Sequence, residues 1–339
     1  MAGMDLNLLT DIPGLRVGHA TDPALGSGVT AILFDAPAVA AVAIGGGAPG
    51  TRDTDLLRTD MTLERVDAIV LSGGSTFGLD AAGGVQAALR EDGRGIRFGG
   101  VNVPLAPQAI LFDLLNGGDK DWGRFSPYRE LGYQAARAAA TGAFALGSVG
   151  AGTGATTATV KGGLGSASTV TAQGHRVAAI MAVNAVGTPL IGDGPWFWAA
   201  PFECGNEFGG RGLPEFRPEY LTPRLKGGPG TATTIGLVVT DAALSKVQAR
   251  RLATMGDDGL ARAILPAHAP TDGDTLFAAS TGTRELHDPI AELTQLGHAA
   301  TQVVARAVAR AIYHARSLAW PGAQPAWVDR FESGKATHA

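Results

Sequence analysis

Apolar residues occur along this chain mainly in short, nearly continuous runs that glycine-rich turns separate. Runs that are apolar on both faces are typical of strands covered on both sides. The pattern predicts such strands at residues 28–35, 38–47, 66–74, 231–240 and 275–281. Two further apolar runs, within residues 165–187, are joined by Gln173 to His175 and predict an antiparallel hairpin.

Apolar residues at helical spacing lie between and after these strands. The spacing and composition predict helices at residues 56–66, 76–89 and 128–142, the last of which stops at a glycine. Ser245 and Gln248 have capping-box spacing, which predicts a helix from there to about Met255. A long C-terminal helix is expected where apolar residues share one face, at Leu293, Leu296, Val304, Val308 and Ile312.

The order of the elements predicts an α/β protein in which layers of sheet are covered by helices. No regular βαβ alternation is present in the pattern. Residues 201–230 are rich in glycine, proline and charge, so we expect a long irregular segment there. Loops of this length in compact proteins are usually functional or disordered. This one stops where the strand at 231–240 begins.

Composition narrows the class of protein. Of the 339 residues, 45% are hydrophobic and 17% charged, which favours a globular chain over a disordered one. A net charge of −4, with few aromatic residues and without a basic tract, argues against nucleic-acid binding. We expect no membrane span and a cytoplasmic location, because apolar runs stay well short of ~20 residues. The single cysteine, Cys204, excludes an intrachain disulfide and is expected to be a small buried apolar residue.

The strand at 231–240, TATTIGLVVT, opens with three threonines in four positions, directly after the glycine-rich stretch KGGPG. A self-cleaving N-terminal-nucleophile protein requires an exposed loop that leads into a buried strand beginning with Thr. The Thr hydroxyl attacks the carbonyl before it, the ester hydrolyses, and the freed α-amine then activates the same hydroxyl. Ordinary β-propensity is the alternative explanation, since threonine favours strands whatever their function.

Other polar residues stand where chemistry is possible. Asp272 and Asp274, in TDGDT, precede the last strand and could orient an amine or hold a proton; the alternative is an Asp-Gly turn. Asn184 is an amide in an otherwise apolar strand, either a satisfied core amide or an oxyanion-hole donor. Lys161, beside several glycines, is either solvated or reaches into a site that the glycines leave open.

The sequence predicts no metal and no organic cofactor. Gly150, Gly152 and Gly154 lack the full spacing of a dinucleotide fingerprint. The stretch TDGDT lacks the longer run of oxygen ligands and the terminal Glu of a calcium loop. The seven histidines are scattered without ligand spacing. We therefore expect side chains and the chain's own α-amine to carry any reaction.

Several motifs occur together in one order over nearly the whole chain: LTDIPGLRVGHATD, AIGGGAPGTRDTDLL, LSGGSTFGLDAAGGV, GAGTGA, KGGLGSAS, VNAVG, TTIGLVVTDA and DGDTLFA. In these motifs the chain resembles the self-processing Ser/Thr aminopeptidases of the L-aminopeptidase D-Ala-esterase/amidase (DmpA) type. That family includes β-peptidyl aminopeptidases and nylon-oligomer hydrolases. The resemblance implies a single domain with a four-layer αββα sandwich of the N-terminal-nucleophile kind, related to ornithine acetyltransferase.

Residue by residue, the resemblance implies a catalytic set. The set consists of Thr233 as nucleophile, Asn184 as oxyanion-hole donor, Lys161 as a lysine of the nylon hydrolases' site, and Asp272 and Asp274 as their acidic pair. Phe112 stands in a segment where some members carry Tyr, so a phenolic helper is not available there. Oxyanion stabilisation is then expected to depend more on Asn184 and main-chain amides.

The resemblance also implies self-cleavage between Ala232 and Thr233, which would leave chains 1–232 and 233–339. Ala232 stands where the family usually has Asn or Gly. The implied protein is a tetramer of cleaved protomers that acts on small peptide, amide or ester substrates with a free amine.

Two alternatives stay open at this point. The chain could be an acyltransferase of the ornithine acetyltransferase type, which also uses a self-cleaved Thr and would depend strongly on an acceptor amine. It could also be an uncleaved binding protein on the same scaffold, with Ala232 preventing maturation. The natural substrate is open as well, since relatives process L-aminoacyl, β-aminoacyl, D-amino acid and nylon-type compounds.

Overall fold

The structure, a computed structural model, describes residues 5–227, 232–321 and 323–332. Its strands in these residues are β1 (Leu15–Asp22), β2 (Ser27–Ile44), β3 (Thr51–Arg52), β4 (Arg65–Ser72), β5 (Ile96–Phe98), β6 (Val101–Val103), β7 (Gln108–Ile110), β8 (Gly163–Val170), β9 (Arg176–Asn184), β10 (Thr233–Ala242) and β11 (Thr275–Arg284). Its α-helices are α1 (Ser75–Gly78), α2 (Ala81–Glu91), α3 (Tyr128–Arg137), α4 (Lys246–Ala263), α5 (Pro289–Tyr313) and α6 (Trp327–Phe331).

The long strand β2 divides the main sheet of the described chain into two halves. Hydrogen bonds join the strands in the order β3-β7-β4-β2-β11-β10-β9-β8, and β1 also pairs with β2. The first part of β2 pairs with β1 and β4, whereas residues 39–44 pair with β11. Between them the register shifts and the residues from Asp35 to Pro37 are exposed. Strand β2 thus passes from one half of the sheet to the other.

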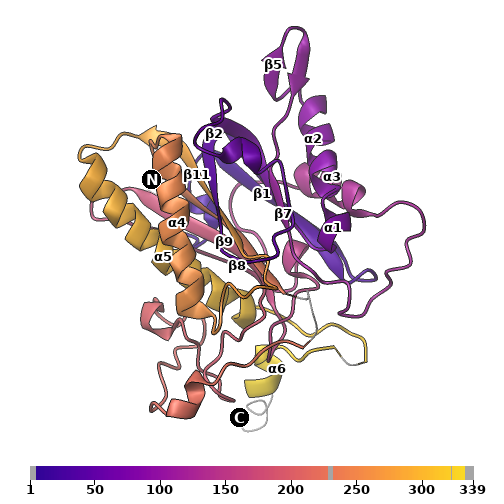
Figure 1. Cartoon of the computed structure of the whole chain (residues 1–339), viewed down its shortest axis with the longest axis vertical. Coiled ribbons are helices and arrows are strands. Elements are labelled where there is room, and N and C mark those ends of the chain that lie inside the picture. Colours follow the sequence, from indigo (N-terminus) through magenta and orange to yellow (C-terminus); the bar gives the residue numbers. More distant parts are fainter. Residues whose placement is uncertain (1–4, 228–231, 322, 333–339) are drawn as a thin grey trace.

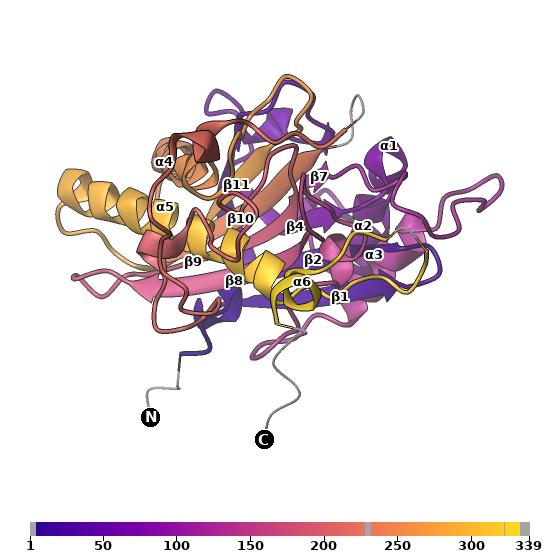
Figure 2. The same cartoon turned by 90° about the horizontal axis from the view of Figure 1, so that it is seen from below.

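The two halves are stacked face to face, and helices cover both outer sides. One apolar cluster combines Ile32 and Ile69 of the first half with Ile180 and Leu237 of the second. A second cluster packs α4 and α5 on the outer face of β8 to β11, and a third packs α2 and α3 on β1, β2 and β4. Figures 1 and 2 show these helix pairs on opposite sides of the strands. The predicted four-layer αββα arrangement is confirmed.

Several predicted elements are confirmed. Strands β8 and β9 form the antiparallel hairpin. Ser245 caps α4 by accepting a hydrogen bond from the Gln248 N–H, although the helix continues to Ala263, beyond the predicted end. Helix α5 corresponds to the expected C-terminal helix. None of the helices in the described ranges is long and apolar enough to cross a membrane.

Two predictions about the first hundred residues are wrong. The runs at 28–35 and 38–47 lie on one bent strand, β2 (Ser27–Ile44), which continues through the exposed residues 35–37 with a shift in its register to β4. Residues 56–66 are not a helix: a short 3-10 turn, Asp55–Leu57, is followed by irregular chain up to β4. The Lys246 ammonium instead binds the carbonyls of Leu56, Met61 and Leu63, the first two of which a helix over these residues would have used internally.

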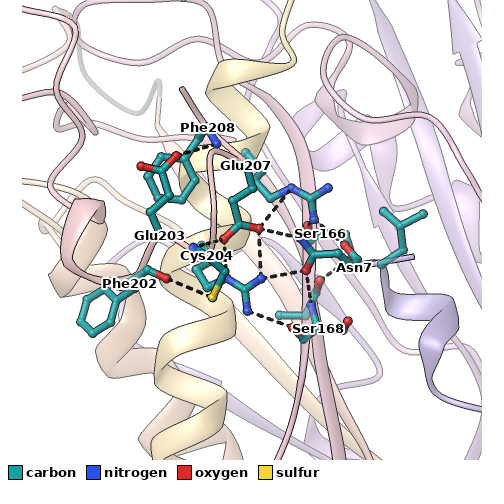
Figure 3. A network of polar contacts seen from close by, with 12 residues as sticks. Asn7, Ser166, Ser168, Phe202, Glu203, Cys204, Glu207 and Phe208 are labelled. Atoms are coloured by element: carbon teal, nitrogen blue, oxygen red, sulfur yellow. Dashed lines mark hydrogen bonds and ion pairs between the residues drawn. The ribbon is translucent and has the colours of Figure 1, made fainter. Parts of the chain in front are cut away.

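The long segment predicted to be irregular contains a buried carboxylate, that of Glu207, which binds it to distant parts of the chain. In residues 201–227 the regular structure is limited to short 3-10 turns, and residues 228–230 lie outside the described residues together with Thr231. Glu207 accepts hydrogen bonds from Arg306 (Nε, 2.6 Å) and from Asn7 (Nδ2, 2.6 Å), as Figure 3 shows for Asn7. Cys204, predicted to be buried, is instead an exposed thiol, because this loop runs over the surface.

Candidate active site

Thr233 is the first residue of β10, which lies between β9 and β11. Side chains alternate along a strand, so Thr233 shares the inner face with Ile235 and Leu237, which pack between the two halves of the sheet. Its hydroxyl donates a hydrogen bond to the carbonyl oxygen of Ala232. Thr233 is only 4% exposed, so in this state its hydroxyl is shielded from a substrate in solution.

Asn184 lies directly across from Thr233, in the antiparallel pair of β9 and β10. Opposed residues of such a pair project from the same face, so both side chains enter the space between the two halves. The Asn184 Oδ1 atom accepts hydrogen bonds from the Thr156 N–H and the Lys226 ammonium, both at 2.9 Å. Its Nδ2 atom donates to the carbonyl of Phe112 at 2.9 Å. These three partners determine which side of the amide carries the oxygen.

Lys161 is buried rather than solvated, with 1% of its surface exposed. Its ammonium donates to three main-chain carbonyls, those of Gly152 (3.1 Å), Ala155 (2.7 Å) and Gly162 (2.9 Å). Burial lowers the pKa of this ammonium to about 7. The contacts hold the loop that ends at Thr156, so Lys161 supports Asn184 through the main chain.

Asp272 and Asp274 are both buried beside the start of β10. Their four carboxylate oxygens accept main-chain N–H groups, from Val186 (3.3 Å) and Ala269 (3.1 Å) at Asp272 and from Thr234 (2.7 Å) and His268 (3.0 Å) at Asp274. Burial and the neighbouring charge of Asp274 raise the pKa of Asp272. The structure therefore brings the acidic pair, Asn184 and Thr233 to the same end of the sheet.

Gly273, between the two aspartates, lies directly against the Thr233 hydroxyl. A Cβ atom at this position would stand 2.7 Å from Thr233 Oγ1 and 2.9 Å from the carbonyl oxygen of Ala48. Such distances are shorter than real Cβ contacts, so glycine is the residue that this position accommodates.

His268 joins the acidic pair to helix α4, a role that the sequence reasoning missed. Its Nδ1 atom lies 3.0 Å from an oxygen of Asp274, and its Nε2 atom lies 3.5 Å from an oxygen of Asp257. The interaction with Asp274, with a smaller effect of Asp257, raises the pKa of His268, while burial raises that of Asp257 to about 6. The nearness of this histidine to TDGDT was the only signal in the sequence.

Lys226 is the second residue that the sequence reasoning missed. Its ammonium donates to Asn184 Oδ1 at 2.9 Å and to the Thr156 carbonyl at 3.2 Å. Burial lowers its pKa to about 7. A pocket of about 140 Å³ is lined by Phe112, Thr156 and Lys226, the three residues that hold the Asn184 amide, among others. In the sequence, this lysine looks like one more solvated charge in an irregular segment.

These groups suit acyl transfer better than metal chemistry. The Thr233 hydroxyl contacts the carbonyl of Ala232, the Asn184 amide lies on the paired residue across β9 and β10, and Asp274 accepts the N–H of the next residue, Thr234. Among the described residues, His, Cys, Asp and Glu side chains do not form a group of three that could hold a metal ion.

The comparison with protein families decides the assignment. Residues 7–324 match the family model described as peptidase family S58. The chain belongs to this family. An uncharacterized aminopeptidase of Mycobacterium leprae is 40% identical to this S58 peptidase, over 93% of this chain and 92% of the relative. A 6-aminohexanoate-oligomer endohydrolase of Kocuria sp. is 31% identical, over 81% and 75% of the two chains.

Solved structures agree with the fold of this S58 peptidase. A β-aminopeptidase of Burkholderia sp. superposes with a TM-score of 0.72 at 23% identity, covering 96% of this chain and 92% of that one. The L-aminopeptidase D-Ala-esterase/amidase of Ochrobactrum anthropi, described as a variant of the Ntn hydrolase fold, gives 0.68 at 20% identity, with 96% and 91% covered. The S58 peptidase thus has this fold and belongs to a hydrolase family of aminopeptidases and amidases.

Proposed function

We propose that this S58 peptidase is a self-processing N-terminal-nucleophile hydrolase that uses Thr233 to cleave amide or ester bonds of small substrates with a free amine. The observation that carries the proposal is the hydrogen bond from the Thr233 hydroxyl to the carbonyl of Ala232. The hydroxyl already lies beside the carbonyl that it has to attack. The first residue of a buried strand holds it there, opposite Asn184.

In the maturation step, Thr233 Oγ1 attacks the carbonyl carbon of Ala232 and the peptide C–N bond breaks. The nitrogen leaves as the α-amine of Thr233, and Ala232 is held as an ester on the hydroxyl. Water then hydrolyses the ester, which frees the hydroxyl and leaves a carboxylate on Ala232. The burial of Thr233 supports such a step. Cleavage would separate Thr233 from Ala232, which is one way to make the hydroxyl accessible to a substrate.

In turnover, the α-amine of Thr233 accepts the hydroxyl proton while Oγ1 attacks the substrate carbonyl, and water resolves the acyl-enzyme. Asn184 donates to the oxyanion, a contact whose loss costs ~100- to 1000-fold in rate in other acyl-transfer enzymes. Asp272 and Asp274 orient the new amine or the substrate's ammonium. Lys161 supports Asn184 through the loop at Thr156. The mechanism requires no cofactor.

The relatives support amide-bond chemistry. One is named as an aminopeptidase and another as a 6-aminohexanoate-oligomer endohydrolase, and we propose that this chain acts on small amides or peptides of the same general kind. We further propose that the cleaved protomers form a homotetramer and work in the cytoplasm, without nucleic-acid or membrane partners.

Intact mass and a panel of aminoacyl p-nitroanilides test the proposal. Cleavage should give chains of 232 and 107 residues (339 − 232). Thr233→Ala should abolish both cleavage and hydrolysis, because the same oxygen serves both. Thr234→Val is the matched control, since this buried hydroxyl has no hydrogen-bond partner in the described structure. An intact, inactive parent would favour the binding-protein alternative, and turnover only with an added acceptor amine would favour the acyltransferase.

A further inference from the structure

Lys226 has contacts that an ordinary loop lysine lacks. Its ammonium touches the Asn184 amide and the Thr156 carbonyl, and its own main-chain N–H donates to the carbonyl of Val186 at 2.8 Å. Val186 lies two residues after Asn184, and its N–H binds Asp272. The main chain of Lys226 is therefore attached to the turn that follows β9, and its ammonium to the last residue of β9.

The Asn184 amide depends on this ammonium for its orientation. Oδ1 faces two N–H donors, one from Thr156 and one from Lys226, while Nδ2 faces the carbonyl of Phe112. A rotation of 180° about the last side-chain bond would put an NH₂ group against both donors and an oxygen against a carbonyl. The Thr156 N–H and the Phe112 carbonyl oppose this rotation through neutral hydrogen bonds, and the ammonium adds a charge-assisted one.

We propose that Lys226 is a positioning residue of the acyl-transfer site, which holds the Asn184 amide with its nitrogen on the side of Phe112. The inference rests on the proposed function for its catalytic consequence. Lys226 acts through Asn184 and not on the reacting atoms, so its removal should affect kcat more than KM. Lys161, by contrast, binds only main-chain carbonyls among its described contacts and supports the loop rather than the amide.

The position of Lys226 also links the site to maturation. The residue precedes Ala232 by six positions, in the segment that ends at the proposed cut. The same oxyanion contact is needed when Thr233 attacks Ala232 as when it attacks a substrate. Loss of the ammonium should therefore slow self-cleavage as well as turnover.

A double-mutant cycle tests the proposal on full-length protein. Lys226→Met keeps an unbranched side chain one atom shorter and removes the donor, and it should lower kcat on the order of 10- to 100-fold with a smaller change in KM. In an Asn184→Ala background, Lys226→Met should not lower kcat further, because the amide that Lys226 positions is absent. Lys226→Arg keeps a charged donor and should restore part of the rate. If Lys226→Met cleaves itself too slowly to yield mature enzyme for kcat, the rate of self-cleavage takes the place of kcat in the same cycle.

The control is Lys246→Met. It removes a buried lysine at the start of α4 whose ammonium donates to the main-chain carbonyls of Leu56, Met61 and Leu63. Its effect on kcat should be within twofold and should persist unchanged in the Asn184→Ala background. A Lys226→Met rate within twofold of the parent, or effects of the two substitutions that multiply, would overturn the inference.

A neutron or atomic-resolution crystal structure of Lys226→Met, in which the amide nitrogen and oxygen are distinguished, decides the positioning role without any activity. We expect the Asn184 amide to turn or to lose its contact with Phe112. An amide held as in the parent would contradict the proposal. A parent that neither cleaves nor hydrolyses would refute the proposed function, and the crystal structure would still test the role of Lys226.

Discussion

Beside the Thr233 hydroxyl there is no room for another carbon atom. A Cβ at position 273 would stand 2.7 Å from Thr233 Oγ1 and 2.9 Å from the Ala48 carbonyl. Gly273→Ala should therefore displace the hydroxyl and slow self-cleavage by about 5- to 150-fold, which corresponds to ~1–3 kcal/mol of overpacking. The time course of the two fragments by intact mass measures the effect.

The control for this substitution is Gly100→Ala, where an added Cβ meets nothing within 4 Å. Its cleavage should match that of the parent. A Gly273→Ala protein that matured at the parental rate would show that the hydroxyl tolerates the displacement, or that another residue is the nucleophile.

His268 gives the acidic pair a pH-dependent neighbour. Asp274 first, and Asp257 second, favour the charged imidazolium and raise the pKa of His268 above its ordinary 6.5; Asp272 acts in the same direction, and burial opposes them. A group whose folded pKa is raised stabilises the fold fully below its unfolded pKa, and this stabilisation is lost as the pH rises through the folded pKa. The imidazolium therefore helps the fold most in acidic solution.

We expect His268→Gln to destabilise the protein most below about pH 6.5 and progressively less as the pH rises above it. Urea unfolding of parent and variant between about pH 5.5 and about pH 9 measures the difference in the free energy of unfolding. The exposed His298 on α5 provides the control, since His298→Gln should show no such trend. A difference that grew with pH would show that the imidazole is bound in its neutral form.

At the scale of elements, the loop from Pro201 and helix α5 are joined by a buried ion pair. Glu207 lies 2.6 Å from Arg306 Nε and 3.7 Å from Arg310 Nε, and the three side chains are 6% to 10% exposed. Figure 3 shows Glu207 in a network of polar contacts that also includes Asn7 and the β8 residues Ser166 and Ser168. The single carboxylate is a shared counter-charge for two buried guanidinium groups.

Glu207→Gln should lower the free energy of unfolding by ~3–5 kcal/mol, the usual effect of removing one partner of a buried pair. Asp193→Asn is the comparison, because Asp193 pairs with Arg224 and Arg330 while its own side chain is 73% exposed. Surface pairs contribute little, so its effect should be much smaller. If denaturant unfolding showed the same decrease in the free energy of unfolding for both variants, burial would not distinguish the two ion pairs.

At the scale of the whole molecule, the two proposed fragments are interleaved. Strands β10 and β11, from residues 233–339, lie between β9 and β2, which belong to residues 1–232. The inner apolar cluster combines side chains from both fragments. Cleavage of the one peptide bond between Ala232 and Thr233 therefore leaves β10 and β11 paired with β9 and β2, and the shared apolar cluster stays packed.

We expect the cleaved fragments to elute together in native size-exclusion chromatography and to separate only in denaturant. The uncleaved Thr233→Ala variant, run under the same conditions, gives the reference elution volume. Fragments that separated in native buffer would contradict the interleaved arrangement.

The parts that local sequence patterns predicted well are those whose burial is decided within a few residues. The β8–β9 hairpin, the Ser245 cap and the apolar face of α5 each follow from periodicity and turn chemistry. The motifs around Thr233 also indicated the family, and the family comparison agrees. The roles of Thr233, Asn184, Lys161 and the acidic pair remain predictions for the experiments above.

The parts that sequence patterns did not predict depend on contacts between distant segments. Where a helix was expected at 56–66, three main-chain carbonyls instead accept hydrogen bonds from Lys246, far along the chain. The candidate roles of Lys226 and His268 depend on contacts with distant residues. The end of β9 places Asn184 against Lys226, and α4 places Asp257 beside His268. Periodicity reports which face of an element is buried, and it carries no information about which distant polar group meets that face.

By itself, the sequence determined the β8–β9 hairpin, the buried face of α5 and a threonine at the start of a buried strand, because these depend on neighbouring residues. The tertiary structure alone decided the bend of β2 between the two halves, the burial of Lys161 and the placement of Lys226 on the Asn184 amide. The reason is physical: hydrogen bonds and desolvation act through space, and strand register and layer packing set those distances.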